Sequence, residues 1–180
     1  LKRKEDTAND KVSESPWYWY FERKSLFTIP DFNLRFGFWQ AVVDSLIEMP
    51  KNISIRAKDL QKHLLLFAKA MAALDQGNVN LANQLAMALD ASLWQFSFDK
   101  SKSGNQRLSD REINRLAIAS LELRGNVASI KGNHEEAVEL FENAIDKGKK
   151  SFVGDPPFYP RPVQESLAKA YLRIQDWENA

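Results

Sequence analysis

The chain contains no cysteine and only two histidines. The absence of cysteine excludes disulfides, thiolate metal sites and cysteine nucleophiles. His63 and His134 lie on different predicted hairpins, and the stretch that begins at His134 lacks the second histidine of the zinc-protease motif. The sequence also has no nucleophile-elbow, phosphate-loop or dinucleotide-binding motif. We therefore expect a protein that is not an enzyme and that needs no metal or cofactor.

The chain also lacks an excess of either charge and a long apolar run. With 25 Lys and Arg against 24 Asp and Glu the formal net charge is +1, which argues against a dedicated nucleic-acid surface. No stretch is apolar for long enough to predict a membrane span. The 180 residues, 44% of them hydrophobic, suffice for one soluble globular unit. The composition does not choose between the cytoplasm and a bacterial periplasm.

One stretch, residues 117–145, has the pattern of two amphipathic helices joined by a tight turn. Gly132 can end the first helix in a left-handed conformation, and Asn133 can cap the second, with Glu136 in the capping-box position. The apolar and small residues fall at helical spacing on either side of the turn. They are Ile118, Leu121, Gly125 and Ala128 before it, and Ala137, Leu140, Phe141 and Ala144 after it.

Similar turn signals at Gly37, Gly77 and Gln175 divide the rest of the chain into hairpins. The charged residues 1–15 predict a disordered arm or linker, and residues 16–180 predict one helical domain. Within it, Ser109 and Glu112 form a capping box, and Pro30 is expected to shorten the helix in front of it. The polar stretch 99–108 predicts a surface loop, and the proline-rich stretch 154–162 predicts extended backbone. The predicted hairpins span about 31–50, 54–98, 109–150 and, cut short, 162–180.

On these residues the chain resembles the tetratricopeptide-repeat (TPR) family. Gly125, Gly132, Ala137, Phe141 and Ala144 match the turn and the small and aromatic positions of the 34-residue repeat on one register. Arg124 departs from it, because the family usually has a leucine there. The resemblance implies an all-α fold, a TPR-like α-solenoid of antiparallel hairpins. A hairpin followed by a proline-rich loop and a PVQESL helix is also similar to larger bacterial TPR proteins, and since the chain begins at Leu1 we expect a portion of such a protein.

The resemblance further implies a concave groove lined by the first helix of each hairpin. Asn126 matches the family's usual anchor for a peptide backbone, whereas Glu122 stands where chaperone-binding members need a lysine. The alternative for the apolar groove positions is that they pack internally. The implied partner-binding residues are Glu122, Asn126 and Ser129 with Ala119 and Ile130, Phe67 and Met71 with Leu64 and Leu74, and Glu165, Lys169 and Arg173.

These features predict a non-catalytic scaffold that binds a protein or peptide partner. One alternative is a regulatory helical module of a larger enzyme or transcription regulator. Another is a small-ligand pocket lined by the aromatic segment from Trp17 to Trp39, although we favour a core role for those rings. Because the last hairpin is cut short, its apolar face predicts self-association at that end. This face comprises Leu167, Tyr171, Leu172 and Trp177.

Overall fold

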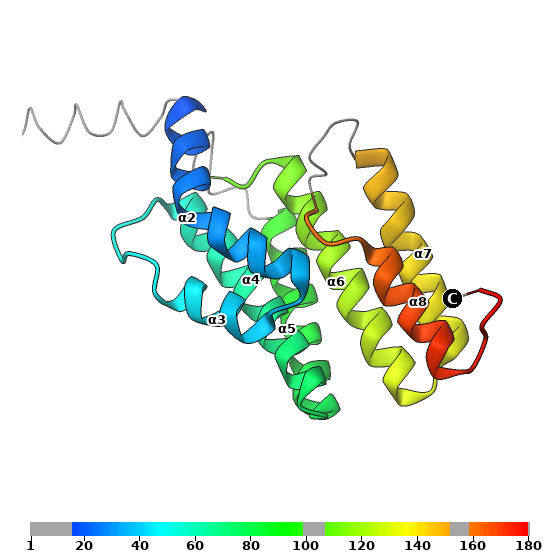
Figure 1. Cartoon of the computed structure of the whole chain (residues 1–180). Helices are drawn as coiled ribbons and strands as arrows, with labels where there is room; N and C mark the ends of the chain where they lie inside the picture. Colours follow the sequence, from blue (N-terminus) through cyan, green and yellow to red (C-terminus); the bar gives the residue numbers. More distant parts are fainter. Residues whose placement is uncertain (1–15, 99–106, 152–158, 180) are drawn as a thin grey trace, which may run out of the picture.

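The computed structural model describes residues 16–98, 107–151 and 159–179, and this part of the chain forms seven helices and no strand (Figure 1). The predicted all-α class is therefore confirmed. The predicted arm over 1–15 and most of the predicted loop over 99–108 lie outside the described residues. The helices are α2 (Pro16–Phe36), α3 (Trp39–Ile47), α4 (Ile55–Asp75), α5 (Val79–Phe98), α6 (Asp110–Lys131), α7 (His134–Ser151) and α8 (Val163–Arg173).

The four predicted turns share one backbone geometry. Gly37, Gly77 and Gly132 end α2, α4 and α6 with φ of 70°, 76° and 85°, and Gln175 follows α8 with φ of 59°. After each of them the next backbone N–H donates to the carbonyl five residues earlier, as in a Schellman motif. The N–O distances are 3.0 Å for Phe38 to Asn33, 2.8 Å for Asn78 to Ala73, 3.0 Å for Asn133 to Ala128 and 3.0 Å for Asp176 to Tyr171.

Side-chain caps fix where several helices begin. Ser109 and Glu112 form the predicted capping box at the start of α6. The Ser54 hydroxyl accepts a bond of 3.1 Å from the backbone N–H of Ala57 at the start of α4. At the start of α5, Asn78 accepts one of 3.1 Å from the backbone N–H of Leu81. The caps at Ser54 and Ser109 thus mark the starts of α4 and α6, whereas α2 begins at Pro16, ahead of the first hairpin expected at about 31–50.

The expectation that Pro30 shortens the first helix is wrong. α2 continues through Pro30 to Phe36 and changes direction along its length (Figure 1). A proline inside a helix removes one backbone bond and costs about 3 kcal/mol. Phe27, Pro30 and Leu34 are all buried, so the packing of this face on the core offsets that cost.

The helices pack in chain order, and the first helices of successive hairpins also touch. α2 contacts α4, α4 contacts α6, and α6 contacts α8, while α6 and α7 share the most extensive contact. Figure 1 shows α3, α4 and α5 on one side of α6, and α7 and α8 on the other. A single apolar core runs through the array.

Gly125 of α6 allows the closest approach between α6 and α7. A methyl group built on Gly125 would lie 2.7 Å from Cε1 of Phe141, which is fully buried. The small residue and the aromatic residue that match the TPR pattern therefore pack directly against each other. This contact places α7 against α6 at a distance that no larger residue permits.

We expect Gly125→Ala to lower the free energy of unfolding by about 1–3 kcal/mol, because the methyl group overpacks the contact with Phe141. Helix propensity alone would favour alanine by about 1 kcal/mol. Gly148→Ala on α7 is the matched control, since its methyl group would lie 3.9 Å from Ile118 Cδ1, an ordinary contact. Urea unfolding followed by circular dichroism measures both variants. Equal effects of the two substitutions would contradict this account of Gly125.

Candidate functional site

The face along which α2, α4, α6 and α8 meet, where a TPR groove would lie, is polar but closed. Glu122, Asn126 and Ser129 of α6 are buried there, although the sequence places them on an open groove. Arg161 and Ser166 are buried as well. Polar side chains survive burial only when they have partners. The geometry of those partners shows what occupies the groove.

The carboxylate of Glu122 is fully buried and accepts three hydrogen bonds. Arg161 Nε donates to Oε1 at 2.8 Å, Ser166 Oγ donates to Oε1 at 2.6 Å, and the Tyr159 hydroxyl donates to Oε2. Asn126 Nδ2 donates to the backbone carbonyl of Glu122 at 2.9 Å. We call Glu122, Tyr159, Arg161 and Ser166 the Glu122 network. Three of its members come from α8 and the residues just before it.

Arg161 also joins the Glu122 network to the first hairpin. Its guanidinium lies 5.1 Å from the centre of the Trp39 ring, and its Nη1 lies beside Gly37 in the turn between α2 and α3. A cation over an indole face is favourable, more so when both groups are desolvated. The same Nη1 approaches Glu165 at 4.0 Å. The residues before α8 thus cross the inner face from α6 to the start of α3.

A second set of charges joins α2 to α6. Asp31 pairs with the buried Arg115 of α6 and, at 3.1 Å, with Arg23. Burial alone would raise the pKa of Asp31, but Arg115 and Arg23 outweigh burial and hold that pKa below its usual range. Arg56 of α4 donates to Glu112 at 2.6 and 3.0 Å and lies 4.3 Å from the centre of the Trp19 ring.

The predicted groove residues of α4 and α6 are therefore packed inside the protein. On α4, Leu64, Phe67, Met71 and Leu74 belong to the core, and the Phe67 ring meets Trp39 edge-on at 5.7 Å. On α6, Ala119 is buried like the three polar residues, whereas Ile130 is exposed. The sequence leaves two arrangements open, an open groove and internal packing, and the apolar positions are packed internally. On α6, Glu122 and Ser129 are bonded to side chains of residues 159–173.

The three predicted residues of α8 are exposed. Arg173 Nη1 donates to Ser129 Oγ at 2.9 Å, so two predicted groove residues bind each other. Glu165 accepts from Arg35 of α2 at 3.1 Å, which brings the first and last hairpins together. Arg124, the departure from the TPR pattern, is exposed and lies 3.8 Å from Asp90 of α5.

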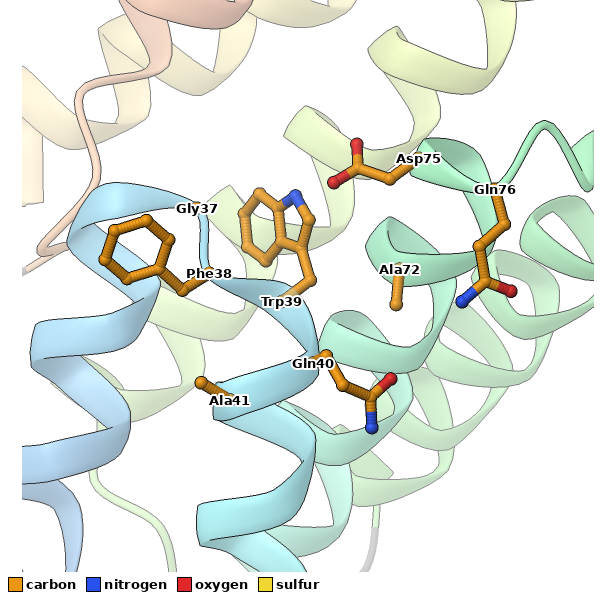
Figure 2. A pocket seen from close by; sticks show the side chains of 8 residues that line it. All are labelled: Gly37, Phe38, Trp39, Gln40, Ala41, Ala72, Asp75 and Gln76. Carbon is orange, nitrogen blue, oxygen red and sulfur yellow. The ribbon is translucent and has the colours of Figure 1, made fainter.

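A hollow of about 330 Å³ lies between the start of α3 and the end of α4 (Figure 2). The Trp39 ring and the Asp75 carboxylate line one side of it, and the Gln40 and Gln76 side chains line the other. Phe38 also borders the hollow, with its ring stacked on Phe36 at 5.9 Å. The hollow thus combines one indole, one carboxylate and two amides.

Most of the aromatic segment from Trp17 to Trp39 does not enter the core, which corrects the core role favoured from the sequence. Phe27 and Trp39 are buried, and Trp19 packs against the core partly exposed. The other rings face solvent over α2 and the turn after it. These are Trp17 (69% exposed), Tyr18, Tyr20, Phe21, Phe32, Phe36 and Phe38.

No family model matches the chain, and no curated protein or solved structure matches it significantly. None of the described helices is long and apolar enough to cross a membrane. Within the described ranges, no three His, Cys, Asp or Glu side chains gather as metal ligands do.

Sequence reasoning missed three of the four members of the Glu122 network. Of the stretch 154–162 that the prolines predict to be extended, residues 154–158 lie outside the described residues, Tyr159 to Arg161 form bends, and Pro162 is extended. Nothing local shows that Tyr159 and Arg161 turn inward. The one usable signal is their chemistry: a phenol and a guanidinium two residues apart are suited to an acidic partner. The buried carboxylate that they share lies 37 and 39 residues earlier in the chain.

We expect the free energy of unfolding to decrease at alkaline pH in the wild type, and we expect Tyr159→Phe to abolish that decrease. Burial, and then the charge of Glu122, raises the pKa of the Tyr159 hydroxyl well above its ordinary value. A phenol whose pKa rises on folding stabilises the fold below its unfolded pKa of about 10, and this contribution is lost as pH rises through the folded pKa.

The measurement is the free energy of unfolding as a function of pH, together with tyrosinate absorbance. The wild-type chain should lose stability above about pH 10, with its last tyrosine ionising as it unfolds. The Phe variant should lack that step and be about 1–3 kcal/mol less stable at neutral pH, because one hydrogen bond to a buried carboxylate is gone. Tyr171→Phe on α8 is the control and should keep the step. A step that persists in the Tyr159 variant would refute the assignment.

We expect Glu122→Gln to destabilise the fold by about 3 kcal/mol, because it leaves the Arg161 cation buried beside a neutral amide. Glu165→Gln is the matched control: it also removes a carboxylate near Arg161, but an exposed one, and should cost less than about 1 kcal/mol. Thermal and urea unfolding of both variants test the difference. Similar losses would mean that the Glu122 network does not hold the last hairpin.

Proposed function

We propose that this chain is a non-catalytic protein-protein interaction scaffold built from TPR-like helical hairpins. The observation that carries the proposal is the exposure of large apolar side chains at both ends of the helical array. At one end, α2 exposes the rings named above. At the other, Leu172, Ile174 and Trp177 are exposed after and along α8, with Trp177 71% exposed.

The solenoid part of the proposal rests on repetition. Four turns have the same Schellman geometry, and each first helix touches the first helix of the next hairpin. Stacking of like units is the principle of repeat proteins, in which every unit covers an apolar face of its neighbour. The hairpins α2–α3, α4–α5 and α6–α7, followed by α8 and its turn, fit such a series.

The same principle explains why the ends matter for binding. The terminal units of a repeat array need a polar outer face to remain in solution alone. Here the end helices present indole and phenyl rings, and exposed apolar patches of this kind mark interaction sites. The inner face is closed by the Glu122 network, so we assign partner binding to the end surfaces rather than to the concave face.

Photo-crosslinking in cells that express the full chain tests the proposal. A photoreactive residue at Trp177 should give discrete adducts with another protein. The same residue at Glu139, an exposed polar position on α7, is the control and should give none. If Trp177 and Glu139 give the same pattern, or if neither gives an adduct, the scaffold proposal fails at this end of the array.

A further inference from the structure

α2 is apolar on two opposite sides. Its inner side contributes Phe27, Pro30 and Leu34 to the core. Its outer side carries a second row of residues at helical spacing, all of them exposed. We call this row the outer stripe: Trp17, Phe21, Ser25, Thr28, Phe32 and Phe36.

The outer stripe reads the same in both directions along the helix. From either end, the order is two aromatic residues, then two small residues with a hydroxyl group, then two aromatic residues. Successive members are four residues apart, except for the central pair Ser25 and Thr28, which are three apart. Counted along the helix from the midpoint between residues 26 and 27, Trp17 and Phe36 are equally distant, and so are Phe21 and Phe32. An antiparallel second copy that crosses α2 at this midpoint would therefore set the Trp17 half of one stripe against the Phe36 half of the other. Such self-complementarity is what a two-fold symmetric interface requires.

The centre of the stripe is suited to close approach. Ser25 and Thr28 have small side chains, so two helices can come near each other at the crossing point. Their hydroxyls already donate within α2, from Ser25 to the Glu22 carbonyl at 3.0 Å and from Thr28 to the Lys24 carbonyl at 2.5 Å. Covering them therefore leaves no hydroxyl donor without a partner.

The charges of α2 leave the stripe free of carboxylates. Glu22 accepts a bond of 2.8 Å from the backbone N–H of Ser54, and Asp31 pairs inward with Arg115. Of the exposed cations, Arg35 is neutralised by Glu165 at 3.1 Å, and Lys24 lies at the edge of the stripe, where its ammonium stays in water. The Arg35 guanidinium also lies 6.0 Å from the centre of the Phe36 ring, so a second helix that covers Phe36 has to leave this cation exposed at its edge.

The exposed area matches what a dimer needs. From their exposed fractions, the four rings of the outer stripe present about 500 Å². The flanking rings of Tyr20 and Phe38, which lie 5.4 Å from Phe21 and 5.9 Å from Phe36, bring the apolar patch to about 700 Å². The largest apolar patch on a typical monomer is about 300–600 Å². A standard protein-protein interface buries about 800 Å² on each partner.

We propose that the outer stripe of α2 is the interface of a symmetric homodimer, in which α2 of one copy packs antiparallel on α2 of the other. This inference rests on the proposed scaffold function and names a second copy of the chain as its first partner. It also places self-association on α2 rather than on the C-terminal face favoured by the sequence.

Sedimentation of the purified full chain tests the oligomeric state. The wild type should have twice the 20.6 kDa mass, with a dissociation constant of about 10 µM or tighter. Phe21→Glu should raise that constant by at least about 100-fold. Ser25→Arg, which keeps every ring, should do the same by blocking the crossing point, and circular dichroism checks that both variants remain helical.

Two controls separate this surface from others. Met87→Glu replaces an apolar residue of α5 that is 66% exposed and should leave the dimer intact. Trp177→Glu should also leave it intact. A monomeric wild type overturns the inference, as does a dimer that Trp177→Glu dissociates and Phe21→Glu does not. Adducts at Trp177 with another protein would still support the scaffold function in either case.

Cysteine cross-linking tests the antiparallel register, because the chain has no cysteine of its own. An oxidised mixture of Phe21→Cys and Phe32→Cys chains should yield the mixed disulfide between the two positions. Phe21→Cys alone should yield little, since the two copies of residue 21 lie about 16 Å apart along the helices in this register. Efficient cross-linking of Phe21→Cys to itself would overturn the antiparallel arrangement.

Discussion

The buried carboxylate of Glu122 determines how the last helix, α8, and the residues before it pack on α6. Glu122 is fully buried, and a buried carboxylate is stable only when donors satisfy its oxygens. Its donors are Tyr159, Arg161 and Ser166, so the residues before α8 and its first turn must lie on α6. Arg161 then carries the constraint to the first hairpin through the Trp39 ring. One ion pair thereby joins hairpins at opposite ends of the chain.

The closure changes which groups of α6 are open to solvent. In an open array the polar residues of the first helices face a ligand, whereas here Asn126 bonds within its own helix and Ser129 accepts from Arg173. The chain's own residues from Tyr159 to Arg173 lie against these groups of α6. Because these groups are satisfied internally, a peptide that displaced them would have to replace each of their bonds. The exposed rings of α2 and Trp177 have no such internal partners to replace, which is why the proposed binding surfaces lie at the ends of the array.

The part of the fold that could be predicted is the part that depends on neighbours in sequence. The four turns and the Ser109 cap follow from a few adjacent residues, and Gly125 against Phe141 follows from repeat spacing. Burial of Glu122 could not be predicted, because a carboxylate on a first helix has the same local pattern whether exposed or covered. The aromatic segment misled for a related reason: both sides of α2 are apolar, and only its packing shows which side is inward.

The orientation of α2 follows from the charges on its inner side. Asp31 pairs with Arg115 and Arg23, and Glu22 bonds to the start of α4, so α2 cannot rotate without breaking bonds that are largely shielded from water. Pro30 and Leu34 occupy the core on the same side. With these positions fixed, the helical period leaves Phe32 and Phe36 only an outward direction. The rings face solvent because the inner side of α2 is occupied by the ion pairs of Asp31 and by the buried Pro30 and Leu34. These contacts fix the direction in which the apolar outer surface of α2 points.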